Sequence, residues 1–266
     1  MTAESWIDAV LARHTAALTT TEFNRALRAL SVRYVERRAS LAARSPIDSA
    51  GKRSAFAAFY APLHFLTTRE IVRALGAHTG QFDTIVDLGC GTGVASAAWA
   101  MECSGRPKLQ GIDKDDWAIG EAKWNWMSLG LAGRATRGDM VRSLEALVSP
   151  AATRGARGSS RTAIVAGWSI NELDNASRER LLPLLVTAAN RGAKVLVIEP
   201  LARGVTPWWD EWAEAFGAAG GRADEWKFDV ALPAPLARID DTAGFSREGL
   251  GARTMGSGLF STETRG

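Results

Sequence analysis

The stretch from Thr84 to Ser96, TIVDLGCGTGVAS, constrains the fold more than any other part of the sequence. Its first five residues predict a buried strand, and the residues that follow Gly93 predict the start of a helix. Three glycines lie between the two: Gly89, Gly91 and Gly93. Because glycine has no side chain and adopts positive φ readily, this spacing predicts a strand-to-helix turn at which a ligand can approach the backbone.

Strand and helix patterns continue to alternate after this turn. Further strands are expected at residues 109–113, 135–139, 161–169 and 193–200, with helical patterns between them. Such alternation predicts an α/β fold, in which a mostly parallel sheet carries helices on both faces. The segments EWKFDVAL and GARTMGS predict a final antiparallel hairpin. We therefore assign residues 81–266 to one α/β domain.

The first 80 residues have a helical pattern instead. Thr19 and Glu22 have the spacing of a capping box, and apolar residues follow at helical spacing. A third helical stretch begins near Arg53, and Pro62 is expected to kink or interrupt it. Residues 1–80 are thus predicted to form an N-terminal helical extension. In TPWWDEW, Thr206 is the expected N-cap of a later helix.

The composition argues against several kinds of protein. No run of 18 apolar residues is present, and the N-terminus lacks the order of a secretory signal, so we expect a cytoplasmic protein without a membrane span. The only cysteines, Cys90 and Cys103, have no histidine nearby and predict no metal site. The formal net charge of +3 is compatible with nucleic-acid binding but does not indicate it.

The glycine turn does not fit a dinucleotide or a P-loop. The third glycine of G-x-G-x-x-G falls on Val94 or Ser96, and no Gly-Lys-Ser/Thr follows. What remains is acid-x-G-x-G-x-G, from Asp87 to Gly93, which closely resembles motif I of the class I S-adenosylmethionine-dependent methyltransferases. The resemblance covers roughly residues 50 to 260 and implies a Rossmann-like fold with a seven-stranded sheet and S-adenosylmethionine as cofactor.

Two carboxylates near the turn are candidates for cofactor binding. Asp87 can attract the ammonium group of the cofactor, directly or through water. Asp113 ends the second strand, 20 residues after Gly93, and can accept hydrogen bonds from both ribose hydroxyls. The alternative for Asp113 is that it caps the helix that starts near Asp115.

The third and fourth strands supply further candidates. By resemblance, Asp139 accepts a hydrogen bond from the adenine amino group and Met140 packs on the ring. The alternatives are a helix cap for Asp139 and core packing for Met140. Trp168, at the end of the fourth strand, faces the same edge and is also assigned to the cofactor site.

Acceptor chemistry is expected just beyond the fourth strand. Asn171 or Glu172 could orient or deprotonate an acceptor, although the same residues could form the turn before the next helix. Glu199, at the end of the fifth strand, could face the cleft or have a structural role. Neither cysteine lies where a nucleophile of pyrimidine carbon-5 methylation would be, and the N-P-P-Y pattern of many base amino-group methyltransferases is absent.

Four segments outside motif I indicate a subfamily. SAFAAFYAPLHFLTTREIVRAL, WSINEL, IEPLARG and ARTMGS resemble the ribosomal small-subunit methyltransferase-like proteins, which include mitochondrial members. Members of that family can hold an iron–sulfur centre, for which two unclustered cysteines do not suffice. This chain therefore departs from the family in that cofactor.

Basic residues in the N-terminal extension predict a possible RNA contact. Between residues 21 and 53 the candidates for binding RNA or a small ribosomal subunit are Arg25, Arg28, Arg33, Arg37 and Arg38. The alternative is a solvated helix face. The leading hypothesis is a methyltransferase acting on RNA, with ribosomal RNA favoured. The alternatives are a small-molecule methyltransferase with the N-terminal helices as a lid, and a non-catalytic ribosome assembly factor.

Overall fold

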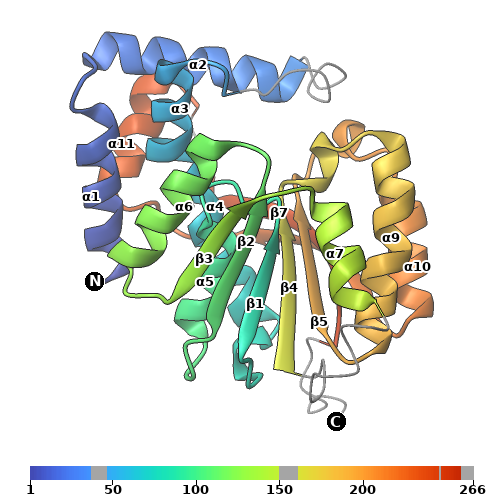
Figure 1. Ribbon diagram of the computed structural model, residues 1–266. Coiled ribbons are helices and arrows are strands. Elements are labelled where there is room, and N and C mark those ends of the chain that lie inside the picture. Colours follow the sequence, from blue (N-terminus) through green and yellow to red (C-terminus); the bar gives the residue numbers. More distant parts are fainter. Residues whose placement is uncertain (37–46, 150–160, 246, 259–266) are drawn as a thin grey trace.

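The structure is a computed structural model that describes residues 1–36, 47–149, 161–245 and 247–258. Its centre is a seven-stranded sheet with the order β3-β2-β1-β4-β5-β7-β6 (Figure 1). The strands are β1 (Thr84–Leu88), β2 (Lys108–Asp113), β3 (Gly133–Arg137), β4 (Thr162–Gly167), β5 (Lys194–Glu199), β6 (Arg222–Phe228) and β7 (Leu250–Ser257). This is the Rossmann-like methyltransferase sheet that the sequence predicts.

The first five strands are parallel, and β7 runs antiparallel to β5 and β6. The predicted pairing of EWKFDVAL with GARTMGS is therefore confirmed, since Trp226 pairs with Ala252. The two strands are not joined by a tight turn, because helix α11 (Ala234–Ala243) lies between them. The third strand ends at Arg137, so Gly138 and Asp139 lie beyond it.

Helices cover both faces of the sheet, because alternate side chains of each central strand point to opposite sides. Ile85 and Val165 contribute to one apolar core and Val86 and Ile164 to the other. The first core is covered by α4 (Ala61–Ala74), α5 (Val94–Glu102) and α6 (Asp116–Ser128). The second is covered by α7 (Met140–Val148), α9 (Asn175–Asn190) and α10 (Trp209–Ala218) (Figure 1).

The N-terminal extension packs into the first of these cores. It consists of α1 (Ala3–Thr15), α2 (Thr20–Glu36), α3 (Ala50–Ala55), a π-helical turn at Phe56–Tyr60, α4 and a short 3-10 turn at Ala77–Thr79. Trp6 and Leu27 are fully buried in the same cluster as Ile85 and Trp99. Figure 1 shows α2 and α3 at the end of the sheet where the parallel strands end. The extension thus covers the edge where a ligand is expected.

The local sequence signals for helix starts and helix kinks have mixed outcomes. The capping box is confirmed, because the Glu22 carboxylate accepts the Thr19 N–H and the Thr19 hydroxyl accepts the Glu22 N–H. Pro62 does not end the helical stretch: it lies in the first turn of α4, directly after the π-helical turn, and the backbone at Tyr60 and Ala61 stays helical. The prediction for Thr206 was wrong. The helix α10 begins at Trp209, and the buried Thr206 hydroxyl instead accepts a hydrogen bond from Arg253.

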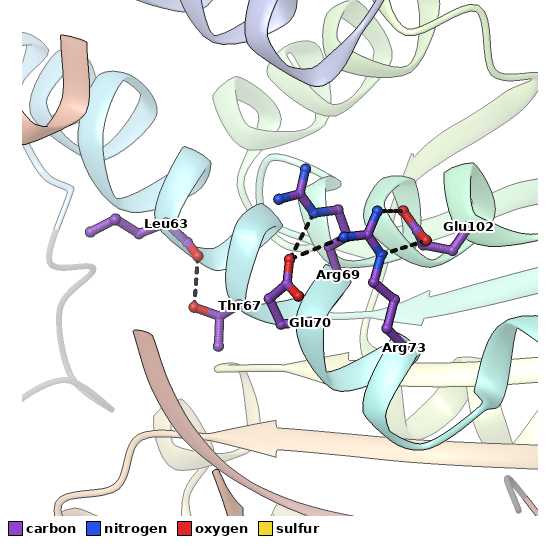
Figure 2. A network of polar contacts seen from close by, with 6 residues as sticks. All are labelled: Leu63, Thr67, Arg69, Glu70, Arg73 and Glu102. Atoms are coloured by element: carbon purple, nitrogen blue, oxygen red, sulfur yellow. Dashed lines mark hydrogen bonds and ion pairs between the residues drawn. The ribbon is translucent and has the colours of Figure 1, made fainter. Parts of the chain in front are cut away.

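An exposed network of charged residues joins α4 to α5 (Figure 2). The guanidinium of Arg73 donates to both oxygens of Glu102, at 2.8 and 3.0 Å, and also to Glu70, which accepts from Arg69. Beneath this network Trp99 is fully buried, and its indole N–H donates to the Ala77 carbonyl. No helix in the described part of the chain has the length and apolarity needed to cross a membrane.

The buried Trp99 side chain and the ion pairs of Arg73 should differ in their contribution to the free energy of unfolding. We expect Trp99→Ala to lower the free energy of unfolding by about 3–5 kcal/mol, because it leaves a large cavity in the core. Arg73→Met should cost less than about 1 kcal/mol, because its ion pairs are solvent-exposed. Urea unfolding of both variants measures the difference, and similar losses would contradict the assignment of stability to the core.

Candidate active site at the carboxyl edge of the sheet

A cavity of about 1120 Å³ lies at the carboxyl edge of the parallel strands. The glycine turn and the ends of β2 and β4 form one part of its wall. The opposite part comes from the N-terminal extension, with Ser31, Phe56, Tyr60 and His64. In an open parallel sheet this edge is where ligands bind.

The turn between β1 and α5 has the left-handed backbone that its glycines predict. The φ angles are +66° at Gly89, +51° at Gly91 and +73° at Gly93. A Cβ on Gly89 would lie 2.6 Å from Ser169 Cβ, and one on Gly93 would lie 2.6 Å from Trp126 Nε1. A Cβ on Gly91 would meet nothing within 4 Å. Gly89 and Gly93 are thus required by packing, whereas Gly91 borders open space in the cavity.

Asp87 lies beneath the turn and is not part of the cavity wall. It is 1% exposed, and its carboxylate accepts the Ser96 N–H in the first turn of α5. Burial raises the pKa of Asp87 to about 7, against the hydrogen bonds from Ser96 and with a small contribution from Asp113. The bond to Ser96 holds α5 against the turn. The attraction of an ammonium group by Asp87, directly or through water, stays a prediction.

Asp113 lines the cavity, as predicted. One of its oxygens accepts the Gly91 N–H at 2.8 Å and the other accepts the Asp115 N–H at 2.9 Å. The N-cap of α6 is Asp115, whose carboxylate accepts the Trp117 and Ala118 N–H groups. Since a carboxylate has about four acceptor sites, Asp113 can support the turn and still accept from a ligand.

The contacts of Asp139 are those of the helix-cap alternative, and its hydrogen bond with the adenine amino group stays a prediction. One oxygen of Asp139 accepts the Val141 and Arg142 N–H groups as the N-cap of α7, and the other lies 3.1 Å from Lys114 Nζ. Asp139 is absent from the cavity wall, because these contacts turn its carboxylate to the helix and to Lys114. The alternatives for Met140 were contact with the cofactor ring and core packing. Its position is compatible with both, because it lines the cavity and packs in the second core.

Buried side chains of α6 hold the turn from behind. The Trp126 indole N–H donates to the Gly93 carbonyl at 2.8 Å, and Asn125 Nδ2 donates to the Thr92 carbonyl at 2.9 Å. Asn125 Oδ1 in turn accepts the indole N–H of Trp6 in α1 at 2.9 Å. The N-terminal helix is thereby connected to the glycine turn by two buried hydrogen bonds. No sequence motif indicates this connection.

Trp168 lies on the cavity wall, as predicted, with a positive φ of +55° that is strained for a residue other than glycine. Its indole stacks on the imidazole of His64, with ring centroids 3.8 Å apart and planes 4° apart. Burial, together with the positive charge of Arg247, lowers the pKa of His64 to about 3, so the imidazole is neutral. The sequence alone indicates only a surface or packing role for His64.

Asn171 and Glu172 both line the cavity, beyond the end of β4. The Asn171 amide donates to Glu199 at 2.7 Å, and the fully buried Glu199 also accepts the backbone N–H groups of Ile170 and Asn171. Burial raises the pKa of Glu199 to about 8. Glu199 therefore has the structural role among its two alternatives, and Asn171 is held by it.

Glu172 has no such partner among the hydrogen bonds of the described residues, and its side chain is open to the cavity. Desolvation at the cavity wall raises the pKa of Glu172 to about 7, and the negative charge of Asp113 adds to this effect. A carboxylate whose pKa lies near 7 can accept a proton at neutral pH. Glu172 is thus the candidate proton acceptor of the cavity.

The predicted RNA contacts stay predictions, and the structure describes the side chains of only two of the five arginines. Arg25 and Arg28 are exposed on α2, but the guanidinium of Arg28 donates to the carbonyls of Thr242 and Ala243 at the end of α11. The side chain of Arg33, and the whole of Arg37 and Arg38, lie outside the described residues. Within the described ranges, no cluster of side chains suits a metal ion.

Residues 66–148 match the family described as methyltransferase small domain. Solved structures that align with this chain include the mitomycin 7-O-methyltransferase MmcR, with 15% identity over 94% of this chain and 71% of that chain and a TM-score of 0.48. TYW2 from P. horikoshii in complex with MeSAdo aligns with 14% identity over 73% of this chain and 62% of that chain, with a TM-score of 0.41.

A putative RNA methyltransferase from Pyrococcus horikoshii aligns with 14% identity over 79% of this chain and 84% of that chain, with a TM-score of 0.41. No curated protein matches the chain in sequence. At such low identities and TM-scores, these structures do not indicate which acceptor this chain uses.

Gly91 and Gly93 should respond differently to a methyl group. We expect Gly93→Ala to lower the melting temperature with or without ligand, because its Cβ collides with Trp126. Gly91→Ala should cost roughly 1–2 kcal/mol of backbone strain. It should also weaken binding of S-adenosylhomocysteine, because its Cβ occupies part of the open space that the ligand is expected to fill. Thermal unfolding with and without this ligand distinguishes them. Equal ligand-induced shifts in Gly91→Ala and the unmutated protein would refute the assignment.

The buried connection to α1 gives a second prediction. Asn125→Leu removes the bond to Thr92 and leaves the Trp6 indole unpaired, so we expect roughly tenfold weaker binding of S-adenosylhomocysteine, on the order of 1–2 kcal/mol. Trp6→Phe keeps the Asn125–Thr92 bond and should have a smaller effect. Calorimetric titration measures both, and an unchanged affinity in Asn125→Leu would show that the turn does not need this support.

Proposed function

We propose that this chain is a class I S-adenosylmethionine-dependent methyltransferase and that it methylates a small molecule with a planar ring, enclosed between the sheet edge and the N-terminal helices. The observation that carries this proposal is the shared cavity. Ser31, Phe56, Tyr60 and His64 line the same space as Gly91 and Asp113. An acceptor beside the cofactor is therefore covered by the N-terminal extension.

The residues of the turn suit the cofactor. Gly91 leaves space for a ligand, and the hydroxyl of Thr92, which also lines the cavity, is buried without a hydrogen-bond partner in the described structure. Asp113 keeps free acceptor capacity for ribose hydroxyls. When bound, S-adenosylmethionine supplies a methyl group on a sulfonium that leaves readily. The volume of about 1120 Å³ exceeds the roughly 300–1,000 Å³ of most single-ligand pockets, which leaves room for a second molecule.

The chain itself has three tasks in this reaction. It must hold the acceptor, keep water away and take up the acceptor's proton where one is lost. The aromatic wall of Trp168 and His64 holds a planar ring, and the N-terminal helices shield it. Glu172 is the group placed to accept the proton. Glu199 fixes the turn that carries Asn171, so this amide can orient the acceptor.

RNA is the second candidate, and one observation favours it. Three of the segments that resemble the ribosomal small-subunit methyltransferase-like family contribute residues to the cavity wall, namely His64, Trp168 and Leu201. A base of RNA would then have to enter the cavity past the N-terminal helices. Arg28, bonded to the end of α11, gives this candidate less support than the sequence suggested.

Transfer of a labelled methyl group distinguishes the two candidates. The protein is incubated with S-adenosylmethionine labelled on its methyl group and, separately, with total RNA and with a small-molecule extract of cells. We expect label in the extract and none in the RNA above that obtained with Gly91→Ala. Label found only in RNA would refute the small-molecule proposal and favour the second candidate.

The pH dependence tests the role of Glu172. Because a proton acceptor must be ionised and the pKa of Glu172 is about 7, we expect kcat/KM to rise with pH through about 7 and then level off. Glu172→Gln should lower the rate and remove this rise. Glu179→Gln, on the exposed face of α9, is the matched control. An unchanged pH profile in Glu172→Gln would exclude Glu172 as the proton acceptor.

A further inference from the structure

We infer that the acceptor is an aromatic acid, whose planar ring stacks on the wall formed by Trp168 and His64 and whose anionic group binds Arg247. This inference rests on the proposed function, because it specifies the acceptor of the same cavity. It depends on three features: a wall of aromatic rings, a cation beside it, and a separation of charge along the cavity.

The aromatic wall has four rings. His64 stacks on Trp168 at 3.8 Å, Phe56 meets His64 edge-on at 6.0 Å, and Tyr60 lies 6.3 Å from Phe56. All four residues line the cavity. Rings in such arrangements attract one another beyond what the burial of their area provides. A planar ligand therefore fits this wall better than a flexible chain.

Arg247 supplies the cation at this wall. It lines the cavity, and about a third of its side chain is exposed (34%). Its guanidinium carbon lies 5.9 Å from the centroid of the Tyr60 ring and 5.4 Å from that of Phe59. The side chain of Asp240 is 4% exposed and holds Arg247 from behind, with 3.0 Å between Nε and Oδ1. A guanidinium has five N–H donors, more than this one carboxylate can accept.

The charged groups of the cavity wall lie on different elements. Asp113 bonds to the glycine turn, whereas the guanidinium of Arg247 lies against the rings of Tyr60 and Phe59 in the N-terminal extension. Two further cations line the cavity and are bonded elsewhere, Lys114 to Asp139 and Arg178 to the Leu173 carbonyl and the Asn175 side chain. A cationic cofactor at the glycine turn thus meets Asp113, and an acceptor at the extension meets Arg247.

A neutral acceptor would be bound less well by this arrangement. A ligand that fills the cavity displaces water that is hydrogen-bonded to the guanidinium of Arg247. The loss of these hydrogen bonds weakens binding unless the ligand supplies acceptors in their place. A carboxylate replaces the lost water with charge-assisted hydrogen bonds, which are stronger than those of a neutral amide. The cavity should therefore prefer an acid over a neutral molecule of the same shape.

Matched pairs of ligands test this preference. The probes are 4-hydroxybenzoate with 4-hydroxybenzamide, and 4-hydroxyquinoline-2-carboxylate with its carboxamide, each titrated calorimetrically into the protein saturated with S-adenosylhomocysteine. We expect at least one acid to bind at least tenfold more tightly than its amide. Trp168→Leu should weaken the acid and the amide alike, because it removes the ring wall and leaves the cation.

Variants of Arg247 show whether the preference comes from this residue. Arg247→Met should remove the preference for the acid, and Arg247→Lys should keep part of it. Because Arg247→Met leaves Asp240 buried without its cation, the double variant Arg247→Met with Asp240→Asn preserves a neutral pair. Retained affinity for S-adenosylhomocysteine shows that these variants are folded. Arg134→Met, an exposed arginine on β3 outside the cavity wall, is the control that should change nothing.

Three results would overturn the inference: no acid binds, no acid is preferred over its amide, or the preference persists in Arg247→Met and in the double variant. The methyl-transfer experiment with the small-molecule extract and total RNA tests the proposed function separately. Labelled products that are all neutral would refute the acid and keep the small-molecule methyltransferase. Label confined to RNA would refute the small-molecule methyltransferase itself.

Discussion

The hydrogen bond from the Gly91 N–H to the Asp113 carboxylate joins the two strands on which the site is built. Gly91 follows β1 and Asp113 ends β2, so this bond fixes the glycine turn relative to the neighbouring strand. A second hydrogen bond, from the Cys90 N–H to the Ile112 carbonyl at 3.0 Å, also fixes the turn relative to β2. Asn125 and Trp126 hold the next two carbonyls of the turn. The open space at Gly91 exists because the turn is restrained on both sides.

Much of this arrangement could be predicted from the sequence because the signals are local. An apolar run followed by alternating glycines indicates a strand, a left-handed turn and a helix without reference to the rest of the chain. The order of strands and helices then gives the parallel sheet, and the end of each strand locates the edge of the sheet. Asp113 and Trp168 were found in this way, since the first ends a strand and the second directly follows one. Glu172 lies in the segment between β4 and α9.

The remaining features depend on residues far apart in the sequence. One of them is the ion pair between Asp139 and Lys114, which lies in the loop after β2. Arg28 lies on α2 but bonds to the end of α11, more than 200 residues later. His64 and Arg247 meet at the cavity through two elements at opposite ends of the chain. No pattern within a short window can indicate such pairs, because their positions are set by how the helices pack.

The π-helical turn at Phe56–Tyr60 has a consequence for how this cavity can change in evolution. In a regular α-helix, residues four apart are offset by about 40° around the axis, and each added or removed residue rotates the preceding helix by about 100°. The π-helical turn has more residues per turn and so counteracts this offset. Phe56, Tyr60 and His64, which are spaced four residues apart, all line the cavity. Loss of one residue here would turn α3, and the helix packed on it, about the axis of α4, and it would disturb the core that the N-terminal extension shares with the sheet. A change of helix length at this turn therefore alters the acceptor wall and the packing of the extension together.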